Sequence, residues 1–154
     1  MSKKVKISLI VVLLIALLIG GNFLYNRYFS VKGYIERVCK IEFPAWTSTE
    51  QEVDNGEFAA IGKYVLAESS RESFITDYQL EAYSKSPIQL TFAYLLTKSN
   101  RPNYAASNLY GKEDCNGPNS WTILTNSVTG ELWIEVAYPD FSGDSVPCDK
   151  LDGK

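Results

Sequence analysis

The residues best suited to chemistry in this chain are carboxylates, and four of them fall close together. They are Glu50, Glu52, Asp54 and Glu57. Hydrolysis of a glycosidic bond needs only two carboxylates, one as the acid and one as the base or nucleophile. A second pair, Glu131 and Glu135, would share a strand face but lie about 13 Å apart, too far to flank one bond. Because the first cluster surrounds a predicted turn, where carboxylates are usually solvated, a carboxylate-dependent cell-wall hydrolase is the least favoured interpretation.

The chain contains no histidine, which removes the most common general base, metal ligand and pH-sensitive group. Its three cysteines lack the paired spacing of zinc sites. The segment Asp140–Ser145 offers several oxygen ligands, but a calcium-binding loop would need glycine and glutamate where this chain has Ser145 and Leu151. No phosphate-binding loop follows a predicted strand, and no serine-nucleophile motif is present. We therefore expect no metal, no cofactor and no enzymatic activity.

Aromatic residues make up 13% of the chain, and three of them fall where a core position is not required. Trp46 lies between predicted elements, and Tyr104 and Tyr110 lie in a long polar segment. Such residues are typical of protein-binding hot spots and of sugar-stacking surfaces. We treat these three, together with the four clustered carboxylates, as candidate binding residues. The other two tryptophans, Trp121 and Trp133, are predicted to belong to the core.

The net charge of −3 is unevenly distributed along the chain. Lys3, Lys4, Lys6 and Arg27 flank an apolar N-terminal segment, so the chain after Ser30 carries 11 basic and 18 acidic residues, a net charge of −7. Phosphate backbones and anionic lipid surfaces repel a domain of that charge. The distribution predicts no nucleic-acid binding and is compatible with a basic partner protein.

The N-terminal segment Ile7–Tyr25 has nineteen residues without a charge. As a helix it would be roughly 28 Å long, close to the hydrocarbon thickness of a bilayer, about 30 Å. Lysines precede it and aromatic residues follow it, no small-residue cleavage pattern is present, and no lipid-accepting cysteine follows Gly20 and Gly21. The pattern predicts a signal-anchor within residues 1–29, with the N-terminus in the cytoplasm and residues 30–154 as an extracytoplasmic, periplasmic-type domain. Cleavage and secretion is the alternative.

Disulfides persist in that compartment, and the chain has three cysteines. Cys115 and Cys148 lie in polar, turn-rich stretches on either side of a predicted hairpin, so we expect them to form a disulfide. Closing that loop would contribute about 4 kcal/mol. Cys39 lies in an apolar pattern and is predicted to be a buried free thiol.

The order of elements predicts an α+β domain with a mixed or antiparallel sheet and two helices on one of its faces. We expect a helix over Ser30–Glu42 ended by Pro44, and a second helix opened by a capping box of Ser69 and Glu72. One β-hairpin turns at Asp54–Glu57. The other elements are a strand at Pro87–Thr97, for which a helix is the alternative, a long loop over Asn100–Ser120, and a hairpin that turns at Asn126–Gly130.

These expectations favour a non-catalytic binding module tethered to a membrane through Ile7–Tyr25. A concrete version is an inhibitor or immunity-type protein whose acidic domain masks a basic partner protein. The alternative is a structural subunit of an envelope or membrane complex, recruited through its transmembrane helix with Gly20 and Gly21 as the contact.

Overall fold

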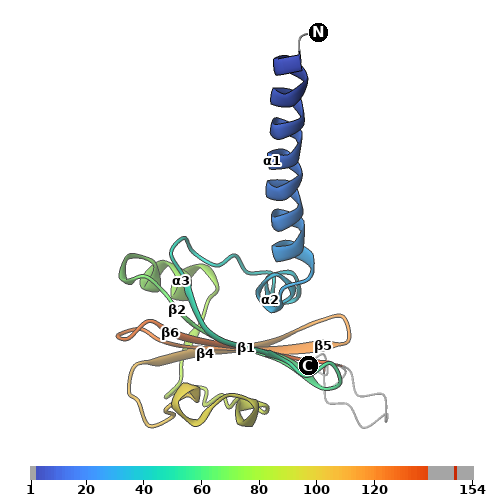
Figure 1. Ribbon diagram of the computed structural model, residues 1–154. Helices are drawn as coiled ribbons and strands as arrows, with labels where there is room; N and C mark the ends of the chain where they lie inside the picture. The colour runs from blue at the N-terminus through green and yellow to red at the C-terminus, as the bar shows by residue number, and fades with distance from the viewer. Residues whose placement is uncertain (1–2, 139–147, 149–154) are drawn as a thin grey trace.

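The computed structural model describes residues 3–138 and 148, which form a six-stranded antiparallel sheet and three α-helices (Figure 1). The helices are α1 (Lys3–Tyr28), α2 (Val31–Cys39) and α3 (Arg71–Asp77). The strands are β1 (Ser48–Asp54), β2 (Ala59–Val65), β3 (Glu81–Ala82), β4 (Leu109–Asn116), β5 (Asn119–Asn126) and β6 (Glu131–Ala137), in the order β1-β2-β6-β5-β4-β3. Short 3-10 turns are η1 (Glu68–Ser70), η2 (Ala93–Leu95) and η3 (Lys98–Asn100). The α+β class is confirmed, with an antiparallel sheet.

The sheet is covered on both faces (Figure 1). On the helix face, α2 and α3 pack over a cluster that includes Tyr64, Trp121 and Ile134. On the opposite face, which we call the loop face, irregular chain over residues 83–108 packs over Ile61, Leu124 and Trp133. Alternation along β6 sends successive side chains to opposite faces, which is why Trp133 and Ile134 belong to different clusters. Both Trp121 and Trp133 are buried, as predicted.

Two predicted segments differ from the structure. The loop expected over Asn100–Ser120 contains β4, which pairs with β5 along its whole length, so three hairpins form rather than two. The strand expected at Pro87–Thr97 is wrong: this segment holds only the 3-10 turn η2. Ile88, Leu90 and Leu96 are buried there without strand pairing. A carboxylate on β6 accepts the N–H groups of Thr91 and Phe92 in place of a neighbouring strand.

The helix ends also differ from prediction. Ser30 caps α2 by accepting the N–H of Gly33 at 3.0 Å, but the helix ends before Pro44, at Lys40, whose backbone is left-handed with φ of 54°. The predicted capping box is wrong, because Ser69 lies inside η1 and α3 begins only at Arg71, without a side-chain cap. The end of α2 and the start of α3 are therefore set by backbone conformation, which a residue pattern predicts only to within a few positions.

The N-terminal helix α1 projects away from the sheet (Figure 1). Its large apolar side chains from Ile10 to Ile19 are between 48% and 73% exposed. Among the residues that the structure describes, no helix combines the length and apolar character needed to cross a membrane. The predicted transmembrane span over Ile7–Tyr25 is therefore not confirmed.

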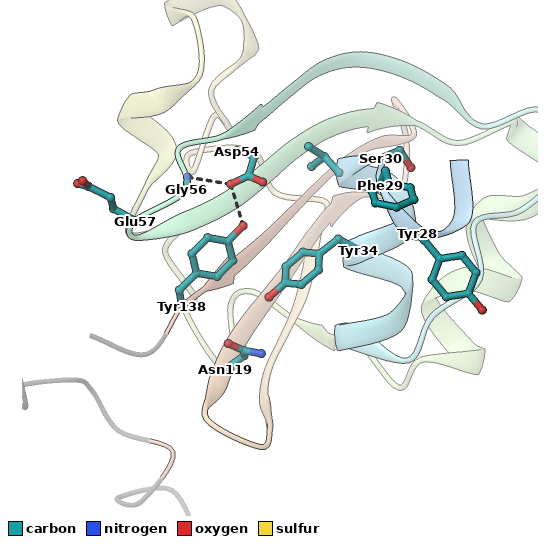
Figure 2. Close-up of a pocket in the computed structure, with 10 residues that line it drawn as sticks. Tyr28, Phe29, Ser30, Tyr34, Asp54, Gly56, Glu57, Asn119 and Tyr138 are labelled. Atoms are coloured by element: carbon teal, nitrogen blue, oxygen red, sulfur yellow. Dashed lines mark hydrogen bonds between the residues drawn. The ribbon is translucent and has the colours of Figure 1, made fainter. Parts of the chain in front are cut away.

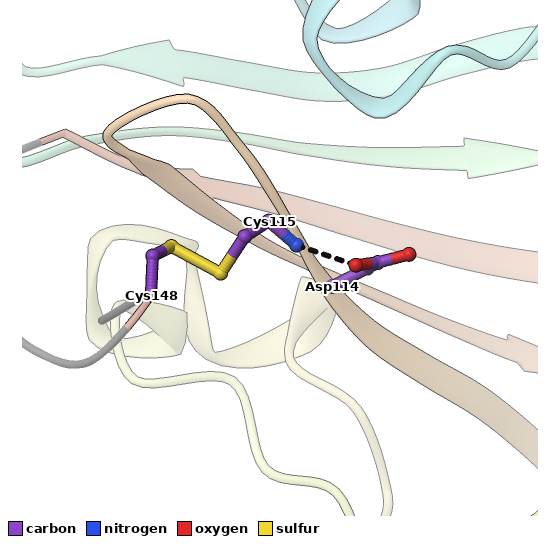
Figure 3. Close-up of a disulfide and its surroundings, with 3 residues drawn as sticks. All are labelled: Asp114, Cys115 and Cys148. Carbon is purple, nitrogen blue, oxygen red and sulfur yellow. Dashed lines mark hydrogen bonds between the residues drawn. A yellow bond between two sulfur atoms is a disulfide. The ribbon is translucent and has the colours of Figure 1, made fainter. Parts of the chain in front are cut away.

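Cys115, near the end of β4, and Cys148 lie at disulfide distance, with their Cα atoms 5.7 Å apart (Figure 3). Beside them, Asp114 accepts the backbone N–H of Cys115 at 2.8 Å (Figure 3). Cys39 is a buried free thiol, and burial raises its pKa far above the usual value. A thiol in that state is a poor nucleophile, as expected of a core residue. The oxygen-rich segment Asp140–Ser145 lies outside the described residues.

Candidate functional site

A pocket of about 480 Å³ opens where α1 meets α2, against the β1–β2 turn (Figure 2). Its ten lining residues include four aromatic rings and two carboxylates, and no lysine or arginine. They are Tyr28, Phe29, Ser30, Val31, Tyr34, Asp54, Gly56, Glu57, Asn119 and Tyr138. We call this site the acidic–aromatic pocket. It gathers four stretches of chain that are far apart in sequence.

Local structure on the helical side fixes one wall of this pocket. The amides of Phe29 and Ser30 both bond to the carbonyl oxygen of Tyr25, at 2.9 and 3.2 Å, so α1 closes tightly before α2 begins. The Ser30 cap then starts α2 two residues after α1 ends. Tyr34 follows on the first turn of α2 and points toward Tyr138, just past the end of β6 (Figure 2). The short junction thus places aromatic side chains of both helices around one opening.

The opposite wall is the β1–β2 turn, which the side chains of Asp54 and Asn55 hold in shape. Asp54 Oδ1 accepts the N–H of Gly56 at 2.9 Å, and Gly56 has a positive φ of 71°. Asn55 Oδ1 accepts the N–H of Phe58 at 2.8 Å. This is the local reason that the D-N-G sequence makes a turn. The turn leaves the Asp54 carboxylate aimed at the pocket and Glu57 at its outer rim (Figure 2).

Asp54 and two tyrosines form the centre of the pocket (Figure 2). The hydroxyl of Tyr138 donates to Asp54 Oδ1 at 2.8 Å, and the rings of Tyr138 and Tyr34 meet edge to face with centroids 5.7 Å apart. Burial, reinforced by Asp54, raises the pKa of both tyrosines. They therefore stay protonated and neutral at physiological pH, which leaves the pocket with a net negative charge. A carboxylate beside aromatic rings suits an ammonium or guanidinium group, because the charge and the ring faces both attract a cation.

The predicted carboxylate cluster divides in the structure. Asp54 and Glu57 line the acidic–aromatic pocket, whereas Glu50 is exposed on β1. Glu52 accepts the hydroxyl of Tyr64 at 2.9 Å. Only two of the four carboxylates therefore share a cavity.

The three predicted aromatic binding residues lie in different places. Tyr104 packs on the loop face, where its hydroxyl accepts the N–H of Leu90 at 3.0 Å, and Tyr110 packs on the helix face. Trp46 is 91% exposed in the connection between α2 and β1. The structure thus does not bring the three together, and none of them lines the acidic–aromatic pocket.

The sequence did not predict that the carboxyl group of Glu135 is buried. Glu135 on β6 is 3% exposed and accepts the N–H groups of Thr91 and Phe92, at 3.1 and 2.7 Å. Burial raises its pKa to about 7, although both N–H donors act in the opposite direction. The group lies under the irregular segment of the loop face, so its burial depends on chain that is distant in sequence. The alternation of side chains along β6 could have predicted this burial, because it places Glu135 on the same face as buried Trp133.

No family model, curated protein or solved structure matches this chain. The acidic–aromatic pocket lies where the apolar N-terminal helix meets the acidic domain, since residues of both line it.

Proposed function

We propose that this protein is a non-catalytic binding module held at the outer face of a membrane by α1, and that its acidic–aromatic pocket takes a basic side chain of a partner protein. The observation that carries the proposal is Asp54, set beside Tyr34 and Tyr138 in a cavity that no lysine or arginine lines. The nearest guanidinium is that of Arg37, which lies 5.4 and 6.0 Å from the ring centroids of Tyr28 and Tyr34, so a ligand would approach Asp54 from the open side of the pocket. An inhibitor or immunity-type protein that masks a basic partner fits this description.

The charges around the pocket support a cationic ligand. The described part of the chain has ion pairs at Lys63–Glu131 and Lys112–Asp114, and neither involves a pocket carboxylate. The hydrogen bonds to Asp54 come from one hydroxyl and one backbone N–H, and neither neutralises its charge. A lysine or arginine side chain entering the pocket would thus meet an unneutralised carboxylate. The net charge of −7 after Ser30 would add long-range attraction for a basic protein.

Support for the tether comes from the apolar N-terminal segment. Ile7–Tyr25 carries no charge, and its large side chains from Ile10 to Ile19 are exposed on a helix that projects away from the domain (Figure 1). Exposed apolar surface of that extent needs cover, and lipid is the cover that suits a uniformly aliphatic helix. Because only Phe29 and Ser30 separate α1 from α2, the pocket would lie next to the lipid surface.

The test is binding of a small basic probe to the full chain in detergent micelles. The probe is the capped tripeptide Gly-Arg-Gly, and the matched probe replaces arginine with citrulline, which has nearly the same shape without the charge. Shifts in the ring NMR signals of Tyr34 and Tyr138 report occupancy of the pocket. We expect the arginine probe to shift both rings, with an affinity that falls as salt rises. Equal binding of the two probes would contradict the proposal.

The variant Asp54→Asn separates charge from structure. Asparagine keeps an oxygen that can accept from Gly56 and Tyr138, so the turn is expected to remain while the charge is lost. We expect binding of the arginine probe to weaken at least tenfold, which is about 1.4 kcal/mol. The control is Glu81→Gln, which removes one negative charge from the exposed far edge strand β3. Unchanged binding in the Asp54 variant would refute the assigned role of that carboxylate.

One observation favours a structural subunit as the second candidate. Gly20 and Gly21 are exposed on α1, with nothing within 4 Å of where a Cβ would lie, so a second helix could approach closely there. Replacing α1 by an unrelated aliphatic helix without glycine distinguishes the two functions. The binding-module proposal predicts retained binding of the arginine probe, and the structural-subunit proposal predicts loss of assembly with a helical partner.

A further inference from the structure

Trp46 is the least covered large apolar side chain among those described, at 91% exposed. The other two tryptophans, Trp121 and Trp133, are 7% and 2% exposed. Trp46 also has a positive φ of 67°, a conformation that is unfavourable for a bulky residue. The adjacent turn maintains it: Thr47 donates its N–H and its hydroxyl to the carbonyl oxygen of Pro44, at 3.2 and 2.7 Å. The chain thus keeps an indole exposed at some cost, without cover from its own domain.

The position of this turn indicates what covers the indole. The connection from α2 to β1, residues 40–47, runs on the same side of the sheet as α1 and α2 (Figure 1). Phe29, at the junction of those two helices, is 77% exposed. With α1 in a membrane, as proposed above, this side of the domain would face the lipid headgroups. Two connecting residues reach at most about 7 Å, so the domain could not move far from that surface.

The stretch 32–42 on this side carries three basic residues, Lys32, Arg37 and Lys40, against two acidic ones, Glu36 and Glu42. Lys32 is half-buried on α2, with its Nζ 4.6 Å from the ring centroid of Phe43. Lys40 follows the helix and is exposed. Glu36 accepts the N–H of Phe43 at 3.2 Å, and Glu42 is exposed, so basic residues exceed acidic ones by one in this stretch. Ammonium groups suit lipid phosphates, and the exposed rings of Phe29 and Trp46 suit the interfacial region.

We propose that Phe29, Lys32, Lys40 and Trp46 form a second membrane contact, with the Trp46 indole in the headgroup layer of a phospholipid surface. The four residues are called the lipid-contact surface below. This inference rests on the proposed tether and goes beyond it, since an anchor alone would leave the domain free to rotate about α1. The second contact fixes the orientation of the domain and holds the acidic–aromatic pocket at the edge of the lipid surface.

The test uses the full chain in phosphatidylcholine vesicles, with and without brominated acyl chains that quench nearby tryptophan emission. Trp121 and Trp133 are buried in the domain, so quenching attributable to Trp46 is the difference between the wild-type chain and Trp46→Phe. If Trp46 emits as strongly as the others, we expect brominated vesicles to remove up to about a third of the wild-type emission and almost none of the variant emission. We also expect the vesicles to shield Trp46 from acrylamide, a water-soluble quencher.

Vesicle flotation separates the possible failures. If the chain floats with the vesicles but Trp46 is quenched by acrylamide and not by brominated lipid, the lipid-contact surface is refuted and the tether stands. If the chain does not float, both the tether and this surface are refuted. The double variant Lys32→Gln, Lys40→Gln is expected to float normally and to lose at least half of the brominated-lipid quenching. Unchanged quenching in this double variant would show that the two lysines do not belong to the lipid-contact surface.

Discussion

Replacing Glu135 by glutamine is expected to change how the stability of this protein depends on pH. The Glu135 carboxyl is buried on the loop face, and burial raises its pKa from 4.5 to about 7. Below pH 4.5 the group is protonated in both the folded and the unfolded chain. Between pH 4.5 and 7 the unfolded chain releases this proton while the folded chain keeps it, so folding becomes less favourable as pH rises. Glutamine does not titrate and removes this contribution.

The size of the effect follows from the difference between the two pKa values. A change from 4.5 to about 7 corresponds to about 3 kcal/mol of unfolding free energy. This contribution is fully present below pH 4.5 and is lost as pH rises through about 7. The two bonds from Thr91 and Phe92 are already included, since they lower the pKa against the larger effect of burial. The stability of the wild-type chain minus that of Glu135→Gln should therefore fall by about 3 kcal/mol between pH 4.5 and 8.

Urea unfolding of the full chain in detergent micelles, followed by tryptophan fluorescence, measures this difference at each pH. Trp133 lies two residues from Glu135 on β6 and is buried, so its emission should report unfolding of the same region. The variant Glu81→Gln corrects for the loss of one negative charge, because it removes a carboxylate from the exposed strand β3. A difference that changes by less than about 1 kcal/mol across the range would refute the argument that burial controls Glu135.

Three further predictions concern stability, each measured by chemical or thermal unfolding of the full chain. Ser30→Ala removes the oxygen that accepts an N–H in the first turn of α2 and should cost about 1 kcal/mol; no loss would show that the cap is unimportant. Gly130→Ala should cost about 2 kcal/mol or more, because φ is 76° and the new Cβ would lie 2.6 Å from the carbonyl oxygen of Leu66; a neutral effect would contradict the tight β5–β6 turn. Reduction of the Cys115–Cys148 pair, which closes a loop of 33 residues, should cost about 4 kcal/mol, and an unchanged unfolding midpoint would show that no bond forms.

Those parts of the fold that depend on near neighbours were predictable from sequence. The β1–β2 hairpin follows from Asp54, Asn55 and Gly56, whose side chains and backbone form the turn without help from distant residues. The helix expected over Ser30–Glu42 contains α2, whose cap at Ser30 is also a local contact. In each case the stabilising contacts lie within a few positions of one another, where a residue pattern carries the information.

The strand β4 was not predicted, because its contacts are not local in the sequence pattern. Beyond Gly111 it is polar on both sides, with Lys112 and Glu113 adjacent, so it lacks the alternation of a half-buried strand. Its strand character comes from pairing with β5 and from burial at its first residues. The covering segment of the loop face was mistaken for a strand for the converse reason: its apolar side chains are buried, but its backbone donors bind Glu135, which is more than forty positions away.

The candidate site was predictable only in part. Asp54 and Glu57 belong to the carboxylate cluster that the sequence shows, whereas nothing in the sequence pattern indicates that Tyr34 and Tyr138 meet them. Their meeting requires the junction of α1 and α2 to lie over one end of the strands of a sheet whose strand order is not sequential. Local patterns contain no information on that arrangement.

The pairing of β2 with β6 has a consequence for how the chain acquires its structure during synthesis. The paired residues lie between 66 positions apart, for Val65 and Glu131, and 78 positions apart, for Ala59 and Ala137. The β1–β2 hairpin is made early, yet one edge of β2 must wait, with its hydrogen-bonding groups unsatisfied, until β6 has been translated. Closing so long a loop is slow compared with forming the consecutive hairpin chain β4–β5–β6. The nascent chain therefore exposes an unpaired strand edge while the 66 positions from Val65 to Glu131 are added, and that interval is when it is most prone to aggregate or to need a chaperone.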